Sequence, residues 1–300
     1  MVLLRSLRHI ACLATCVFLA CPGRAMPVEA PSALSERGSS SGKRIILWET
    51  KLTSELPSIP GLWAAATALA SSRVIKSITN WETKRPSELP KTLPYRPMVR
   101  TPQHLEGDNW TNLISVVSTQ QNTIVHFYNE PERNGIKASD AVASWREKML
   151  PLRQKYGVKL VGPGCASSGE GSAWLQAFMG MLSDDEKPDY LNLHFYTLPS
   201  NPCDQEIRNA EHYFSEKHTT YNLPVIIGEM ASTSRDGAQV VQFTKEVSKW
   251  LDEPAQSWVV EYGFFGVSTS VDDNFVSPAA QMLDSTGGFT DLGKWYIFGG

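Results

Sequence analysis

Eight short apolar runs alternate with helix-like segments from Lys43 to the C-terminus, and this alternation limits the possible folds more than any other feature. The runs cover residues 44–50, 73–81, 95–100, 123–130, 158–164, 190–197, 223–230 and 257–266. They lack strict polar alternation, as expected for parallel strands buried on both faces. Such repetition over about 260 residues predicts a single (β/α)8 TIM barrel of the α/β class. An open, doubly wound sheet is the alternative, but no glycine-rich phosphate loop follows the first run.

Helix signals lie between the runs. Pro60 begins an alanine-rich helix to about residue 72, and Asp108 is a good N-cap for a helix to about residue 120. Residues 139–157 show helical spacing, with Pro151 expected to kink the helix and Gly157 to end it. Further helices are expected near residues 172–182, 206–218, 236–251 and 278–283. The expected core includes Ile46, Val74, Ile78, Val125, Leu160, Leu191, Leu193, Ile226 and Val260.

The first 25 residues have the composition of a secretory signal peptide. Two arginines precede an apolar stretch at residues 10–21, and small residues fit a cleavage site before Met26. A membrane anchor is the alternative, but the stretch is short for a bilayer span. Residues 26–42, rich in Ser, Pro, Ala and Gly, are predicted to be a flexible leader. Residues 43–300 then form one barrel domain.

Secretion changes how the cysteines are interpreted. Cleavage leaves Cys165 and Cys203, and an even pair in an oxidising compartment predicts a disulfide; two free buried thiols are the alternative.

Asn109 begins an Asn-Trp-Thr acceptor for N-glycosylation. The net charge is -3 without a basic block, so nucleic acid is not an expected partner. We expect a monomer, secreted or in the cell wall, with no membrane span.

Two glutamates follow expected strands on opposite sides of the barrel. Glu130 ends the fourth run and Glu229 the seventh. The C-terminal ends of barrel strands form the active-site face. Glycoside hydrolysis needs two facing carboxyl groups, one protonated toward the leaving oxygen and one ionised toward the anomeric carbon. We expect these carboxyls about 5–5.5 Å apart, as in retaining enzymes. We also expect their pKa values to be separated, with that of Glu130 raised.

Other strand ends bring further candidates to the same face. Asn129, His194 and Tyr196 stand beside the glutamates in sequence or at the end of the sixth run. Trp48 ends the first run, either as a surface for a sugar ring or as a core residue. One histidine and two glutamates could bind zinc, but no HExxH-like spacing occurs, so no metal or other cofactor is expected. Three more acidic residues are interpreted as solvated loop charges: Glu49, Glu132 and Glu170.

Seven motifs in order resemble those of one enzyme family. The Asn-Glu-Pro after the fourth run and Glu229 after the seventh resemble clan A retaining glycosidases. In finer detail the chain resembles glycoside hydrolase family 128, the fungal and bacterial β-1,3-glucanases. The motifs are ITNW (78–81), FYNEPE (127–132), LVGPGCA (160–166), WLQAF (174–178), LNLHFYT (191–197), PVIIGEMA (224–231) and EYGFFG (261–266).

The resemblance implies roles for the strand-end residues. Glu130 would be the acid/base and Glu229 the nucleophile, and Asn129 would bind the sugar 2-hydroxyl. His194 and Tyr196 would line the site near the nucleophile. The implied sugar platforms are Trp81 and Phe264.

The chain departs from the family pattern at four positions. Phe195 and Phe264 replace tryptophans, Glu261 replaces an arginine, and Gly228 replaces a threonine. These differences leave open whether cleavage is at chain ends or internal, and how strict the linkage preference is. A secreted β-1,3-glucanase, acting on glucan such as that of fungal cell walls, is the expected function. The alternative is a glucan-binding protein on the same scaffold with little or no hydrolysis.

Overall fold

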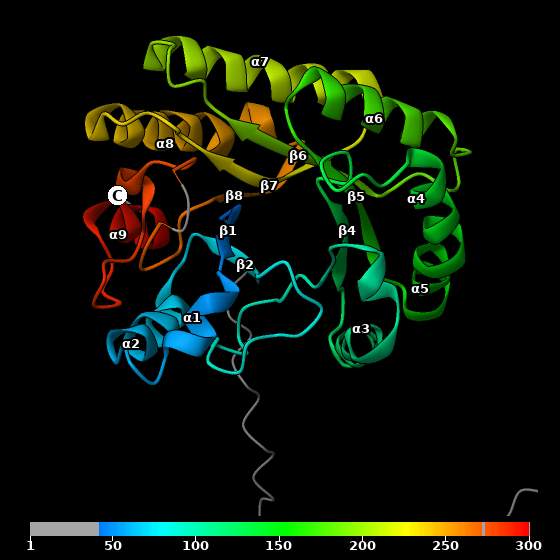
Figure 1. Ribbon diagram of the computed structural model, residues 1–300, viewed down its shortest axis with the longest axis horizontal. Helices are drawn as coiled ribbons and strands as arrows, with labels where there is room; N and C mark the ends of the chain where they lie inside the picture. The colour runs from blue at the N-terminus through cyan, green and yellow to red at the C-terminus, as the bar shows by residue number, and fades with distance from the viewer. Residues whose placement is uncertain (1–41, 272–273, 300) are drawn as a thin grey trace, which may run out of the picture. The chain divides into compact units, whose positions relative to one another are not determined.

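The computed structural model describes residues 42–271 and 274–299, which belong to one compact unit, Ser39–Gly300. The predicted signal peptide, and the predicted leader up to residue 41, lie outside the described residues. Eight parallel strands with helices between them confirm the predicted TIM barrel (Figure 1). The strands are β1 (Arg44–Leu47), β2 (Ile75–Thr79), β3 (Met98–Val99), β4 (Ile124–Asn129), β5 (Lys159–Cys165), β6 (Tyr190–Tyr196), β7 (Val225–Ala231) and β8 (Val259–Phe264).

The strands form a sheet in the order β2-β1-β8-β7-β6-β5-β4-β3. β2 and β3 lie at its two edges, and the chain just before β3 joins them. A parallel bridge links Ile78 to Tyr95, and the Arg96 N–H donates to the Ile78 carbonyl at 2.8 Å. The barrel therefore closes through these residues, although β3 itself has only two residues.

Helices follow the strands on the outside of the barrel (Figure 1). They are α1 (Thr50–Glu55), α2 (Gly61–Ala68), α3 (Gly107–Thr119), α4 (Ala138–Ser144), α5 (Leu150–Tyr156), α6 (Gly169–Gly180), α7 (Cys203–Tyr221), α8 (Gly237–Asp252) and α9 (Asp291–Phe298). Short 3-10 turns occur at Leu69–Ser71, Pro102–Leu105, Pro254–Gln256 and Pro278–Ala280. The sequence patterns did not predict α1 or α9, and the helix expected near residue 278 is only a single 3-10 turn.

The helix expected over residues 139–157 is interrupted as predicted, and the interruption has a definite form. α4 continues through a π-helical turn, Trp145–Met149, into α5. Pro151 lies in the first turn of α5, where its missing N–H costs least, and the wider turn before it accommodates the ring. Gly157 ends α5 with a left-handed φ of 65°.

The barrel interior contains a buried ion pair between β8 and the closing segment. Arg96 donates to both carboxylate oxygens of Glu261, and the Ser77 hydroxyl donates to the same carboxylate at 2.5 Å. Burial raises the pKa of Glu261, but Arg96, the Ser77 hydroxyl and His126 together lower it more, so it lies below its ordinary value. Glu261, which replaces an arginine of the family pattern, therefore pairs with the buried cation of Arg96. Nearby His126 is fully buried, which lowers its pKa to about 4 and leaves the ring neutral at pH 7.

The predicted disulfide is wrong, because Cys165 and Cys203 are both free, buried thiols. Cys165 ends β5 beside Leu193 of β6. Cys203 begins α7, and its thiol donates to the Gln239 carbonyl of α8 at 3.3 Å.

A chain lacking residues 1–25 is expected to carry two thiols that react only after unfolding. Burial raises the pKa of both Cys165 and Cys203, so little thiolate is present in the native state. A chromogenic thiol reagent should therefore find both thiols in denaturant without reductant, and react slowly with either in native protein. A denatured chain that yields thiols only after reduction would instead carry a disulfide.

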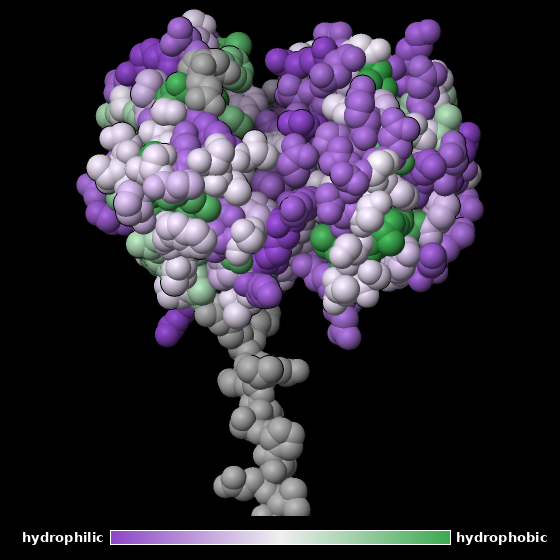
Figure 2. All heavy atoms as spheres, turned by 60° about the horizontal axis from the view of Figure 1, so that its bottom comes forward, coloured by the Kyte–Doolittle hydropathy of each residue, from purple (hydrophilic) through white to green (hydrophobic). Residues whose placement is uncertain are grey.

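Within the described residues, no helix is both long enough and apolar enough to cross a bilayer. The face in Figure 2 is mostly hydrophilic, with small separate apolar patches. The large exposed apolar side chains are Trp63, Met181, Leu198, Phe275 and Phe298. Of these, Phe275 has its ring 5.0 Å from that of Tyr196.

Candidate active site

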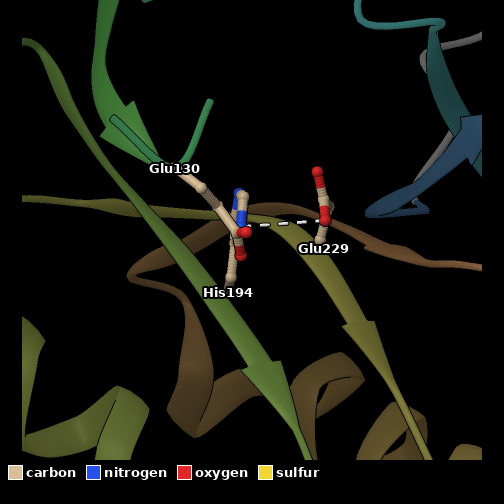
Figure 3. A group of neighbouring side chains, drawn as sticks. All are labelled: Glu130, His194 and Glu229. Carbon is tan, nitrogen blue, oxygen red and sulfur yellow. Dashed lines mark hydrogen bonds and ion pairs between the residues drawn. The ribbon is translucent and has the colours of Figure 1, made fainter. Parts of the chain in front are cut away.

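Three strand ends bring two carboxylates and an imidazole together. Glu130 follows β4, His194 lies on β6 and Glu229 lies on β7, and the three side chains point toward one another (Figure 3). His194 Nδ1 lies 3.3 Å from Glu130 Oε1 and 3.7 Å from Glu229 Oε2. One oxygen of each carboxylate and a ring nitrogen of His194 all lie within 4.8 Å of one another. The two glutamates expected at opposite sides of the barrel therefore lie close together, although β5 and β6 separate their strands.

Hydrogen bonds hold Glu229 in one orientation. Trp81 Nε1 donates to Oε1 at 2.5 Å, and the Tyr196 hydroxyl donates to Oε2 at 2.8 Å. Trp81 comes from the end of β2, and Tyr196 ends β6. Burial and then Glu229 raise the pKa of Tyr196 well above its ordinary value, so its hydroxyl stays a donor. Trp81 and Tyr196 therefore aim the carboxylate.

The electrostatics of the site favour the protonated form of His194 and the ionised form of Glu130. Burial lowers the pKa of His194, but Glu229, Glu130 and Glu132 raise it more, so it lies above its ordinary value. For Glu130, burial raises the pKa, but the hydrogen bond from His194 and the charges of His194 and Arg133 lower it more. The expectation of a raised pKa for Glu130 is therefore wrong, because the imidazolium of His194 stabilises its ionised form.

The backbone is strained at Trp81 and Glu130, which present two of these groups, and at Tyr128, two residues before Glu130. Trp81, Tyr128 and Glu130 have positive φ values of 60°, 35° and 42°. Residues with side chains rarely adopt such angles, and each costs about 1–3 kcal/mol, which is seen mostly at functional sites. The Glu130 N–H donates to the Gly164 carbonyl at 2.7 Å, and this bond holds the turned backbone against β5.

Three other predicted site residues, Asn129, Trp48 and Phe264, differ in burial and in their contacts. Asn129 is half-buried beside Glu130, and its Oδ1 has no hydrogen-bond partner among the described residues. Trp48 is fully buried, and its Nε1 donates to Glu88, so the prediction that it binds sugar is wrong. Phe264 is also buried, packed against Phe243 and Tyr296, so its prediction as a platform is wrong too.

The error at Phe264 comes from strand alternation. Successive side chains of a strand point to opposite faces. Glu261 points into the barrel and Tyr262 toward the helices, so Phe264 also points outward. The next residue, Phe265, is half-exposed, and its ring lies 5.6 Å from that of Trp81. The aromatic surface at this strand end is therefore Phe265.

Sequence reasoning missed three more residues near the site. Phe275, 47% exposed, lies on the loop after β8 with its ring 5.0 Å from that of Tyr196. Arg133 Nε lies 3.3 Å from Glu130 Oε2. Glu132, expected in solvent, is buried and accepts from the Ala166 N–H at 2.8 Å. Arg133 could have been identified from the sequence, because it lies three residues after Glu130. Nothing in the sequence around Phe275 indicated that this residue lies at the site.

The glycine at position 228 makes room for a neighbouring side chain. Asn192 of β6 occupies the space that a residue at 228 would need, since a Cβ there would lie 2.3 Å from Asn192 Oδ1. The same oxygen accepts from the Gly228 N–H at 3.1 Å. A threonine at this position would therefore displace Asn192.

In the described part of the chain, Glu130, His194 and Glu229 also form the one group with metal-ligand chemistry. Both oxygens of Glu229 already accept hydrogen bonds from Trp81 and Tyr196. His194 Nδ1 lies 3.3 Å from Glu130 Oε1, a distance at which the two groups can share a proton. The donor arrangement therefore suits proton transfer better than metal binding.

Comparisons with known proteins agree with this chemistry. Residues 63–296 match a model of the glycosyl hydrolase catalytic core. The crystal structure of an exo-β-1,3-glucanase of family 128, subgroup VI, from Aureobasidium namibiae is 34% identical. The match covers 87% of this chain and 98% of that chain, with a TM-score of 0.74. No curated protein sequence matches the chain.

Two more distant structures share the fold. One is a subgroup V exo-β-1,3-glucanase from Cryptococcus neoformans, 23% identical, covering 86% of this chain and 99% of that chain, with a TM-score of 0.62. The other is a subgroup IV endo-β-1,3-glucanase from Lentinula edodes, 23% identical, covering 86% and 100%, with a TM-score of 0.67. With the catalytic-core match and the 34% identity over nearly all of both chains, this chain belongs to glycoside hydrolase family 128.

Proposed function

We propose that this glycoside hydrolase is a retaining β-1,3-glucanase, with Glu130 as acid/base and Glu229 as nucleophile. The observation that carries the proposal is the close approach of the two carboxylates, since one oxygen of each lies within 4.8 Å of the other. Retaining enzymes hold the two carboxyls about 5–5.5 Å apart, whereas inverting enzymes leave about 6.5–9.5 Å for a water. The separation therefore supports direct attack by a carboxylate.

The substrate class follows from the relative that shares 34% identity, which is an exo-β-1,3-glucanase. The local chemistry suits a neutral sugar. Phe265 and Phe275 offer apolar ring faces, and the unpartnered Asn129 Oδ1 can accept from a hydroxyl. A chain that only bound glucan would need these surfaces but not two carboxylates aimed at one point.

In the first step, Glu229 attacks the anomeric carbon while Glu130 gives its proton to the leaving oxygen. The C–O bond to the leaving sugar breaks, and a glycosyl–Glu229 ester forms. In the second step, Glu130 takes a proton from water, and that water displaces Glu229. Trp81 and Tyr196 hold Glu229 on the line of attack in both steps.

The first step needs a proton on Glu130, and His194 is the group that can donate it. The two groups share a hydrogen bond of 3.3 Å, with the pKa of Glu130 lowered and that of His194 raised. A bound sugar displaces water from around Glu130, and burial already raises the pKa of this carboxyl. Substrate binding therefore moves the shared proton from His194 toward Glu130.

Replacing His194 by Asn is expected to move the alkaline limb of the kcat/KM profile to lower pH. In the wild type, the pair loses its last proton above the ordinary histidine pKa of 6.5, because the pKa of His194 is raised. In H194N the proton is held by Glu130 alone, whose ordinary pKa is 4.5. Profiles between about pH 3 and pH 9 measure this shift. An unchanged alkaline limb, with only a lower maximum, would contradict proton sharing.

Secretion is part of the same proposal. The composition of residues 1–25 supports export, and Asn109 lies half-buried in the first turn of α3 as the acceptor. Expression in a eukaryotic secretory host, followed by N-terminal sequencing and glycosidase treatment of the product, tests it. Retention of residues 1–25 in the exported protein would count against a cleaved signal.

The function itself is tested by assaying purified protein on laminarin and on short β-1,3-linked oligosaccharides, with products separated by size. Product anomers followed by NMR report the stereochemistry, and retention of the β-configuration is expected. Binding of glucan without hydrolysis of any β-glucan would overturn the enzyme proposal, and α-products would overturn the retaining mechanism alone.

A further inference from the structure

Glu132 is a buried carboxylate at the barrel mouth that the two-step mechanism does not use. It follows Glu130 and Pro131 in the turn after β4, where a charged side chain would ordinarily be in solvent, yet it is only 9% exposed. Burying a carboxylate costs free energy unless hydrogen bonds replace those that water would make. The burial of Glu132 therefore needs a hydrogen-bond partner to support it.

A backbone N–H at the end of β5 is that partner. The Ala166 N–H donates to Glu132 Oε1 at 2.8 Å, and both groups are buried. Ala166 is the first residue after β5. The thiol of Cys165 beside it stays neutral, because burial and then the charge of Glu132 raise its pKa. A hydrogen bond to a carboxylate in such surroundings is stronger than one in water.

Two hydrogen bonds to the end of β5 hold the turn that carries Glu130. The Glu130 N–H donates to the Gly164 carbonyl at 2.7 Å, and the Glu132 carboxylate accepts from Ala166, two residues further along. Pro131 lies between the two glutamates, and its ring fixes its own φ. The turn therefore has little freedom between its two attachments to β5.

These attachments matter because the backbone at Glu130 is strained. Its φ of 42° is one that residues with side chains rarely adopt, and such angles persist only where the surrounding structure enforces them. If the turn relaxed, the Glu130 carboxylate would leave its place 3.3 Å from His194 Nδ1. Glu229 would stay in position, because Trp81 and Tyr196 hold the nucleophile independently.

We propose that Glu132 is a positioning residue for the acid/base, and that its hydrogen bond from the Ala166 N–H holds the turn that aims Glu130 at the leaving oxygen. The proposal rests on the proposed function and adds to it the group that keeps one of the two carboxylates in place. Loss of this bond should impair proton transfer by Glu130 and spare the attack by Glu229. General loosening of the fold would instead slow the reaction of every substrate.

Glu132→Met removes the acceptor at similar side-chain volume, and two substrates show which step it affects. On laminarin, whose leaving sugar needs a proton, kcat/KM should fall about 100-fold, the effect of a misplacement of about 1 Å. On 2,4-dinitrophenyl β-laminaribioside, whose leaving group needs no proton, kcat/KM should change about threefold or less. On this second substrate kcat should fall and azide should restore it, because the second step also depends on Glu130.

Two further variants separate the hydrogen bond from charge and from folding. Glu132→Gln keeps an oxygen that can accept from Ala166 but carries no charge, so its kcat/KM on laminarin should stay within about threefold of wild type. Glu132→Asp keeps the charge but draws the oxygens back by one methylene. It should show the same selective loss as Glu132→Met, and it decides the question if the methionine variant does not fold.

The matched control is Glu206→Met, which removes another buried carboxylate that accepts from a backbone N–H. Glu206 is 3% exposed and accepts from the Leu198 N–H at 2.9 Å, after β6. This variant should keep the wild-type ratio of the two kcat/KM values, and thermal unfolding of each variant reports any change in stability.

The positioning role would be overturned by equal losses on both substrates in Glu132→Met and Glu132→Asp, or by no loss on either. A glutamine variant as impaired as the methionine variant would overturn it too, because the charge and not the hydrogen bond would then be responsible. These results would leave the glucanase function intact. Absence of hydrolysis of any β-glucan by the wild type would instead overturn the proposed function.

Discussion

Glu229→Gln is expected to lose hydrolysis of β-1,3-glucan by roughly 10⁴-fold or more, because no other described side chain at the site can attack the anomeric carbon. The amide keeps the shape of the carboxylate, so glucan affinity should be largely retained. The loss should be the same on substrates with good leaving groups, since the missing step is the attack itself. Initial rates on laminarin and on an activated aryl glycoside measure both losses.

Glu130→Gln should behave differently on the two kinds of substrate. Natural glucan needs a proton on its leaving sugar, so its hydrolysis should be lost. An aryl glycoside with an acidic leaving group needs no proton, so Glu229 can still form the glycosyl-enzyme, which then accumulates. Azide should restore turnover, because a small anion resolves the intermediate without a general base.

The matched control is Glu170→Gln, which changes an exposed carboxylate at the start of α6 and should leave all rates unchanged. The role assignment would be contradicted by two glutamate variants that behave alike on the activated substrate and show no response to azide. Activity retained by Glu229→Gln on laminarin would remove this residue from the mechanism altogether.

Arg96→Met is expected to lower the free energy of unfolding by about 3–5 kcal/mol, because it leaves the Glu261 carboxylate buried without its cation. The double variant Arg96→Met, Glu261→Met should recover most of this loss. Two apolar side chains of similar volume avoid the cost of burying charge. Urea unfolding at pH 7 measures the three proteins.

The pH dependence of this loss has a definite sign. The pKa of Glu261 in the folded protein lies below its ordinary value of 4.5. Its contribution to stability is therefore complete above pH 4.5 and is lost as the pH falls through the folded value. The difference between wild type and Arg96→Met should shrink below pH 4.5.

Arg146→Met serves as the control for ion pairing in general, because the Arg146–Glu186 pair is solvent-exposed and should contribute far less. A loss for Arg96→Met no larger than that for Arg146→Met would show that Glu261 finds another partner or takes up a proton at little cost.

The local patterns predicted elements well where one segment carried the whole signal. All eight expected strands occur, and Gly157 ends its helix with the left-handed conformation that glycine favours. Two helices, α1 and α9, were not predicted because their segments gave no clear helix signal. α1 lacks an apolar run, and α9 follows a loop that gave no helix signal. Val74 and Val260, expected in the core, are only half-buried; Val74 precedes β2, and Val260 is the second residue of β8.

The candidate site was predictable to the extent that its groups lie at strand ends. Glu130, Glu229, His194 and Tyr196 could be assigned to one mouth because every parallel barrel strand ends on the same face. Which neighbouring aromatic faces the mouth depends on strand alternation, and an error of one residue at Phe264 chose the buried ring instead of Phe265.

By itself, the amino-acid sequence determined the barrel, the two glutamates and their position at one face, because periodicity and strand order are local properties of the chain. Only the tertiary structure decided which groups meet across the barrel. Glu261 pairs with Arg96, 165 residues away, and the ring of His194 lies between Glu130 and Glu229. These contacts depend on the register of strands that are distant in sequence. That register also decides the charge state of the site, since the imidazolium that stabilises ionised Glu130 is brought there by β6.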